Sequence, residues 1–191
     1  MRELPILFNT EMVQAITAGR KTATRRLVRA KSRRACGFYV TSRKSDGTFM
    51  GVYDYDDQER QFDNPQTPPA QVGDLLYIRE TWAKWSGGYA YKAQDPLTDH
   101  NYPAGCERWK PSIHMPKAAA RIWLKVTAAR VEKLQDMEME DNRNYIAEGA
   151  ADRHDFIRIW DATVNDESKQ WYGNPWVWVI EFERCERPEG E

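Results

Sequence analysis

Alternating apolar residues near the C-terminal end of the chain place the strongest single constraint on its fold. Residues 175–184 read PWVWVIEFER, in which the large series Trp176, Trp178, Ile180 and Phe182 alternates with Val177, Val179, Glu181 and Glu183. A period of two predicts a β-strand, here with one strongly aromatic face. Other elements must cover such a face, so we expect a sheet that packs against helices around a hydrophobic core.

Shorter patterns predict the remaining elements. In chain order we expect a strand at 5–9, a helix capped by Asn9 or Thr10 that ends before Gly19, a hairpin within 36–55 that turns at Asp46-Gly47, strands at 75–80 and 120–131, and helices at 137–147 and 153–163. Residues 83–111 show no sustained period and are predicted to be irregular. This order favours a compact mixed sheet or barrel with helices at its rim over regular βαβ winding.

Length and composition indicate one globular domain over residues 1–191. Apolar residues make up 41% of the chain and aromatic residues 12%, which is typical of a protein with a packed core. No apolar run approaches the ~20 residues that span a bilayer, and the N-terminal residues do not resemble a secretory signal. We therefore expect a cytoplasmic protein that has no membrane partner.

Positive charge is concentrated in one segment of a nearly neutral chain. The formal net charge is -1, yet residues 20–44 contain ten Lys and Arg residues and no Asp or Glu. Such a segment suits an anionic ligand such as nucleic acid, whereas the overall charge does not suit a protein that coats nucleic acid. The alternative interpretation is a solvated loop, particularly for residues 29–34.

The stretch AGRKTATRR at residues 18–26 contains the most suggestive candidates for chemistry. It lacks the additional glycine of a phosphate-binding loop and follows a predicted helix instead of a strand, which argues against a nucleoside triphosphatase. Lys21 would act as a base or nucleophile if burial or nearby arginines lowered its pKa, and Thr24 lies close in sequence. The alternative is that Lys21 only decorates a helix C-terminus and that Thr22 and Thr24 are ordinary strand residues.

A carboxylate partner for Lys21 is suggested by a second unusual position. Glu148 lies in the last turn of a predicted helix, directly before Gly149, where a negative charge opposes the helix dipole. A carboxylate in this position would be explained by a bond to Lys21, although a solvated glutamate would tolerate the modest cost. Glu80, which follows Arg79 at the end of a predicted core strand, is the competing acid.

The sequence does not predict a metal site or another cofactor. His100, Cys106, His114 and Cys36 form no short ligand pair of the kind that structural zinc requires. The odd number of widely spaced cysteines also argues against a disulfide framework.

Several blocks of the chain together resemble the ASCH domains of the PUA-like superfamily. They are GRKTATRR at residues 19–26, VGDLLYIRE at 72–80, IAEG at 146–149 and WVWVIEFER at 176–184, and WKPSIHMP at 109–116 is similar to a run in the longer phage and prophage members. The resemblance implies an α+β fold with a small mixed β-barrel, helices at its rim and a cleft for RNA or nucleotide-like ligands. Residues 29–70 and 83–111 would be two insertions.

One branch of this family removes the acetyl group from N4-acetylcytidine, and its motif implies catalytic roles for Lys21, Thr24 and Glu148. Thr24 would attack or position water, Lys21 would accept the proton and Glu148 would hold Lys21. We expect substrate contacts from five further residues: Thr22, Arg26, Arg79, Glu80 and Trp82. Arg26 or Arg79 would stabilise an oxyanion or bind a phosphate, and a tryptophan such as Trp82 would stack on a base.

The sequence leaves two other functions open. The chain resembles proteins that bind RNA or cleave it, so it could be a non-catalytic nucleic-acid-binding module or a ribonuclease of phage origin, gripping phosphates through residues 20–44. It could also bind a host protein through its two insertions while the pocket stays idle. The oligomeric state is not indicated by any feature of the sequence.

Overall fold

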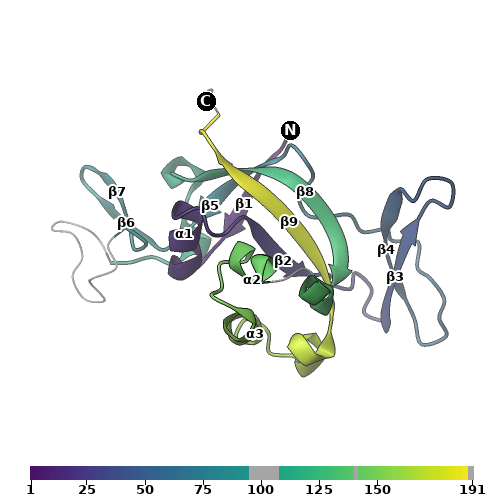
Figure 1. The fold of residues 1–191 in the computed structure, drawn as a ribbon. Helices are drawn as coiled ribbons and strands as arrows, with labels where there is room; N and C mark the ends of the chain where they lie inside the picture. Colours follow the sequence, from purple (N-terminus) through teal and green to yellow (C-terminus); the bar gives the residue numbers. More distant parts are fainter. Residues whose placement is uncertain (95–107, 140–141, 189–191) are drawn as a thin grey trace.

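A five-stranded sheet forms the centre of the protein (Figure 1), as seen in a computed structural model that describes residues 1–94, 108–139 and 142–188. The strands lie in the order β1 (Glu3–Leu7), β5 (Leu75–Arg79), β8 (Trp123–Lys133), β9 (Trp176–Cys185) and β2 (Ala23–Leu27). β1 and β5 pair in parallel, and the other neighbours pair antiparallel. The predicted α+β class is therefore confirmed.

The sheet does not close into a barrel within the part of the chain that is described. β1 and β2 are its two edges, and no backbone ladder joins them. The edges nevertheless come close, because Arg26 Nη2 of β2 donates a hydrogen bond of 2.9 Å to the carbonyl of Leu7 in β1. A small cavity of about 220 Å³ lies between them. The Arg26 side chain thus bridges the two edge strands, which in a closed barrel would be joined by backbone hydrogen bonds.

Three α-helices accompany the sheet: α1 (Thr10–Thr17), α2 (Arg143–Ala147) and α3 (Arg153–Asp161). Asn9 caps α1 as predicted, since its side chain accepts a hydrogen bond of 2.8 Å from the Met12 amide. α2 and α3 lie together beside β2 and β9 (Figure 1). The helix predicted over residues 137–147 is wrong at its N-terminal end, where the chain instead forms the 3₁₀ segment η3 (Leu134–Met139). Only the C-terminal part of the predicted helix is present, as α2.

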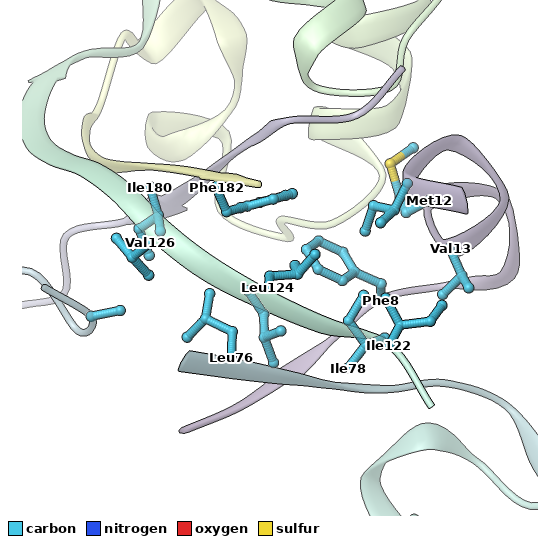
Figure 2. Close-up of a cluster of buried hydrophobic side chains, with 13 residues drawn as sticks. Phe8, Met12, Val13, Leu76, Ile78, Ile122, Leu124, Val126, Ile180 and Phe182 are labelled. Atoms are coloured by element: carbon cyan, nitrogen blue, oxygen red, sulfur yellow. The ribbon is translucent and has the colours of Figure 1, made fainter. Parts of the chain in front are cut away.

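Both faces of the sheet are covered near its centre. Figure 2 shows one core cluster, in which Phe8 and Met12 lie near Ile122 and Leu124 of the sheet. Along β9, Phe182 faces this cluster whereas Val177 belongs to a second cluster beneath α2 and α3. The strand predicted to have one strongly aromatic face is therefore buried on both faces, because the helices cover the side of Val177 and Val179.

Two hairpins extend from opposite ends of the sheet (Figure 1). β3 (Gly37–Ser42) and β4 (Phe49–Tyr55) form the hairpin predicted within residues 36–55, and Gly47 adopts the positive φ of +70° that its turn requires. β6 (Trp82–Trp85) and β7 (Gly88–Tyr91) form a second hairpin. The prediction that all of residues 83–111 are irregular is therefore wrong for this part, and residues 95–107 lie outside the described chain.

Short 3₁₀ segments complete the described structure. They are η1 (Ser112–His114), η2 (Lys117–Ala119), η4 (Glu167–Lys169) and η5 (Trp171–Gly173), in addition to η3. Among the described helices, none has the length and apolar character needed to cross a membrane.

A buried carboxylate fixes the start of β1 against β5. Asp74 accepts hydrogen bonds from the backbone amide and Nε of Arg2, both at 3.0 Å, and from the Gln71 amide at 2.9 Å. The side-chain hydrogen bonds from Arg2 hold the pKa of Asp74 well below its usual value of 3.8.

Asp74→Ala should lower the free energy of unfolding at neutral pH by about 1–3 kcal/mol, because the amides of Arg2 and Gln71 and the Arg2 side chain lose a buried, charged acceptor. A carboxylate with a lowered pKa in the folded protein stabilises fully above its unfolded pKa, and this contribution disappears as the pH falls through the folded value. The difference between wild type and variant should therefore shrink below about pH 3.8. Urea unfolding at several pH values measures it, and a difference that persists unchanged in acid would contradict the assignment.

Candidate active site

The turn between α1 and β2 directs Lys21 into the protein. Gly19 has a φ of +73° and ends the helix, and the amides of Arg20 and Lys21 both donate to the Ala15 carbonyl, at 2.9 and 3.1 Å. The chain then enters β2, and only 3% of Lys21 is exposed. Lys21 therefore does not decorate a helix end in solvent, which was the alternative interpretation of its sequence position.

Three oxygen atoms surround the Lys21 ammonium group. Nζ donates to the carbonyls of Ala23 and Glu148, both at 2.7 Å, and to Glu148 Oε2 at 3.0 Å. The number of acceptors matches the three protons of an ammonium group. The Phe8 ring lies on another side, with its centroid 5.4 Å from Nζ. The position of the amine is therefore fixed by a carboxylate, two carbonyls and an aromatic ring.

A glycine allows Glu148 and Lys21 to come together. Gly149 has a φ of +87°, and a Cβ atom built on it would lie 3.3 Å from Lys21 Cδ and 3.2 Å from the Met12 sulfur. Any larger residue would combine an unfavourable backbone conformation with tight contacts on both sides. Glu148 is the cap residue of α2, so this glycine ends the helix at the point where the carboxylate meets the amine.

A second cation binds the other oxygen of Glu148. Arg25 Nη1 donates to Glu148 Oε1 at 3.1 Å, while Arg25 Nη2 and Nε donate to Glu132 Oε1 at 2.7 and 3.0 Å. The Arg25 and Lys21 side chains are each 2% exposed, and that of Glu148 is 7% exposed. Lys21, Glu148, Arg25 and Glu132 therefore form one network, which Glu132 extends toward the surface through its ion pair with Arg130 at 3.0 Å and Arg130 continues to Glu181, so that three positive charges meet three negative charges.

Burial lowers the pKa of Lys21 below its usual value, and the nearby negative charge of Glu148 opposes this change. The positive charges of Arg25 and Arg26 add smaller contributions in the lowering direction. Desolvation disfavours the charged amine, so a modest disturbance of its partners would make a neutral, proton-accepting lysine more accessible. This is a property that a general base requires.

Lys21, Thr24 and Glu148 all line one cavity of about 530 Å³. Thr24 lies on β2 and is 4% exposed, and its hydroxyl makes no hydrogen bond within the described chain. The opposite wall comes from α3 and the residues that follow it, including Phe156 and Trp160. The cavity has the size of many small-molecule sites and combines apolar walls with a few convergent polar groups.

The structure places the other expected substrate contacts differently. Arg26 lines the same cavity, because alternation along β2 turns Thr24 and Arg26 to one face. Thr22 lines a separate polar cavity of about 350 Å³ instead. Arg79 donates to the backbone carbonyls of Ile113 and Met115, the first of these bonds being very short. It therefore cannot serve this cavity.

Glu80 and Trp82 also lie apart from the cavity. Both Glu80 oxygens accept hydrogen bonds from Arg121, from Nε at 2.9 Å and from Nη2 at 3.0 Å, and Glu80 is 1% exposed. Trp82 is buried in a cluster with Met115. Both residues follow β5, whose last residue Arg79 pairs with Leu7 beside the cavity, but their side chains turn toward Arg121 and Met115 and do not line it. Glu80 is thus not the partner of Lys21.

Residues that sequence reasoning missed complete the site. Phe8 contacts both Lys21 and Arg26, with each cation about 5.4 Å from the ring centroid. Trp160 forms part of the wall, and Glu132 anchors Arg25. Phe8 and Trp160 look like ordinary apolar core residues, and Glu132 looks like a solvated residue of a strand. In the sequence, only the two adjacent arginines of TRR at residues 24–26 indicated that a second cation would lie near Lys21.

Metal ligands do not gather anywhere in the described chain in groups of three or more His, Cys, Asp or Glu side chains. His100 and Cys106, two of the candidates named from the sequence, lie outside the described residues.

Comparisons of the chain with protein-family models, with curated proteins and with solved structures find no match. A functional assignment therefore depends on the chemistry of the site itself.

Proposed function

We propose that the protein is an ASCH-type amide hydrolase that acts on an N4-acylated cytosine nucleoside or a related modified base. The observation that carries this proposal is the meeting of Lys21, Thr24 and Glu148 at one cavity of about 530 Å³. Glu148 lies 127 residues from Lys21 in sequence, yet its Oε2 is 3.0 Å from Lys21 Nζ. The nearly closed sheet also fits the proposal that the domain is a PUA-like barrel.

The residues around the cavity supply the groups that amide hydrolysis needs. Thr24 attacks the acyl carbon or positions the water that attacks it, and Lys21 accepts the proton that the nucleophile loses. The bond from the acyl carbon to N4 then breaks, and N4 takes up a proton as it leaves. Water provides the remaining atoms, so the products are a carboxylic acid and the free cytosine amine.

Two further features favour a planar aromatic substrate. Phe8, Phe156 and Trp160 give the cavity flat apolar surfaces on which a base could stack. Arg26 extends along one side and retains N–H donors beyond the one that it gives to Leu7. These donors would stabilise the oxyanion of the tetrahedral intermediate or bind a phosphate.

The decisive test incubates the purified protein with N4-acetylcytidine and follows the release of cytidine and acetate by chromatography. We expect multiple turnovers without added metal or cofactor. An absence of turnover, or equal turnover by a Lys21→Met variant, would refute the proposed function.

Thr24→Val separates catalysis from stability. The change removes the hydroxyl but keeps the side-chain shape, and this hydroxyl has no hydrogen-bond partner in the described chain. The free energy of unfolding should therefore change by less than about 1 kcal/mol, whereas hydrolysis should fall by at least about 10²-fold. Thr24→Ser, which keeps the hydroxyl, is the matched control and should retain most of the activity. Full activity in Thr24→Val would exclude a role for this hydroxyl.

A further inference from the structure

Charge is distributed unevenly along the walls of the Lys21 cavity. Five charged residues line it: Lys21, Arg25, Arg26, Arg29 and Glu148. The positive charges of Lys21 and Arg25 are balanced by Glu148 and by Glu132, which binds Arg25 from behind. Arg26 and Arg29 form no ion pair within the described chain. Two positive charges on the cavity wall therefore have no ion-pair partner in the described chain.

These two arginines are the exposed cations of the cavity, and Arg26 is the one nearer to Lys21, because both of these cations lie 5.4 Å from the centre of the Phe8 ring. Both residues are exposed, whereas Lys21 and Glu148 are buried. Arg26 is anchored by its bond to the Leu7 carbonyl and by the Phe8 ring, so its guanidinium is held at the wall. Arg29 makes no side-chain hydrogen bond or ion pair within the described chain that would turn it elsewhere. The cavity thus has a charge-balanced inner end and a positively charged outer end.

We propose that the outer end is a phosphate subsite, formed by Arg26 and Arg29, and that the substrate is a phosphorylated form of the modified cytidine. This inference rests on the proposed function, because it places the acylated base beside Lys21 and Thr24. Ribose separates base and phosphate in a nucleotide, so a base at the inner end directs its phosphate toward the arginines. Paired guanidinium groups match phosphate oxygens in both charge and geometry.

Phosphate is favoured over a carboxylate or a neutral group by the count of charges. Two exposed guanidinium groups that line one cavity and have no ion-pair partner in the described chain complement an anion that carries one or two negative charges and several acceptor oxygens. Two sources share this chemistry: a free 5′-nucleotide and the backbone of an RNA that contains the modified base. Arg26 and Arg29 would bind the phosphate of a free nucleotide or of an RNA, so the experiment compares these two kinds of substrate.

The experiment measures kcat/KM for N4-acetylcytidine, for its 5′-monophosphate and for a short single-stranded RNA with N4-acetylcytidine at its centre. One or both phosphorylated substrates should exceed the nucleoside by about 10- to 100-fold, the range expected for charge-assisted hydrogen bonds. A higher value for the monophosphate identifies a nucleotide enzyme, and a higher value for the RNA identifies an RNA enzyme. Equal values for all three substrates would overturn the proposal.

Variants test whether these arginines cause the preference. Arg29→Gln and Arg26→Gln should each reduce the ratio of kcat/KM between phosphorylated substrate and nucleoside. The matched control is Arg33→Gln, an exposed arginine of the same basic segment that does not line the cavity, and it should leave the ratio unchanged. A ratio that survives in Arg26→Gln and Arg29→Gln would place phosphate recognition elsewhere and overturn the assignment.

A binding measurement keeps this inference distinct from the proposed function. Calorimetric titration with cytidine and with cytidine 5′-monophosphate reports the phosphate preference even if no substrate is hydrolysed. If hydrolysis fails, tighter binding of the monophosphate than of cytidine would still support the subsite, provided that Arg29→Gln weakens that binding. Equal affinity for the two ligands, in the presence of hydrolysis, would overturn the subsite alone.

Discussion

Replacing Lys21 with methionine should lower kcat/KM for N4-acetylcytidine by about 10²- to 10⁴-fold, the range typical of a lost general base. Methionine fills a similar volume but cannot accept a proton. The Lys21 amine is held inside the protein by Glu148 and two carbonyls at 2.7–3.0 Å. We therefore expect that a lysine on the protein surface does not substitute for it in the variant. Steady-state kinetics on the purified variant measures the loss.

The control for this variant is Lys84→Met, because Lys84 is an exposed lysine of β6 and does not line the cavity. It should keep the wild-type rate. A circular dichroism spectrum of Lys21→Met must match that of wild type, so that the loss is not one of folding. Activity within a few-fold of wild type in a folded Lys21→Met protein would remove Lys21 from the mechanism.

The pH dependence of the rate provides a second readout of the same residue. A general base works in its neutral form, so kcat/KM should rise with pH until the pKa of Lys21 is passed. Because burial lowers that pKa, the plateau should begin below the pH at which a free lysine titrates. A rate that falls over this range would mean that the charged amine is the active form.

Glu148→Ala should produce the largest loss of stability, about 3–5 kcal/mol in the free energy of unfolding. The variant leaves the buried Lys21 ammonium without its carboxylate and removes one of the two acceptors of Arg25. Uncompensated buried charge is costly because the interior cannot replace the lost hydration. Urea unfolding, monitored by the fluorescence of the tryptophans, measures the change.

A double-mutant cycle with Lys21→Met tests the origin of this loss. Removing the amine as well as the carboxylate eliminates the unpaired charge, so the double variant should be more stable than the sum of the single losses by about 0.5–3 kcal/mol. Glu183→Ala, at an exposed position of β9, is the matched control and should stay within about 0.5 kcal/mol of wild type. Strict additivity of Lys21→Met and Glu148→Ala would contradict the ion pair.

Local patterns in the sequence determined most of the secondary structure. The alternation at the C-terminal end predicts β9, the Asp46-Gly47 pair predicts the β3–β4 hairpin, and Asn9 predicts the start of α1. The β6–β7 hairpin was missed although Ser86-Gly87 separates its strands, because the surrounding glycines, prolines and aspartates obscured a short alternation. Such signals act over a few residues and are therefore readable without a fold.

The candidate site was predictable only in part. Lys21, Thr24 and Glu148 were named from an unusual charge pattern and from a resemblance, and they do line one cavity. Arg79, Glu80 and Trp82 were expected beside them, but their side chains turn to Ile113, Arg121 and Met115 and do not line the cavity, although Arg79 pairs with Leu7 at its edge. The sequence shows that these side chains are polar or aromatic, but it does not show which neighbours they bind.

By itself, then, the sequence determined which segments form strands and helices and where charge and glycine interrupt them. The tertiary structure decided which of these polar side chains share a cavity and which are neutralised. Glu148 reaches Lys21 across 127 residues, and Glu132 reaches Arg25 across 107. The physical reason is that burial and ion pairing depend on contacts between distant segments, and sequence periodicity reports only the orientation of a side chain on its own strand or helix.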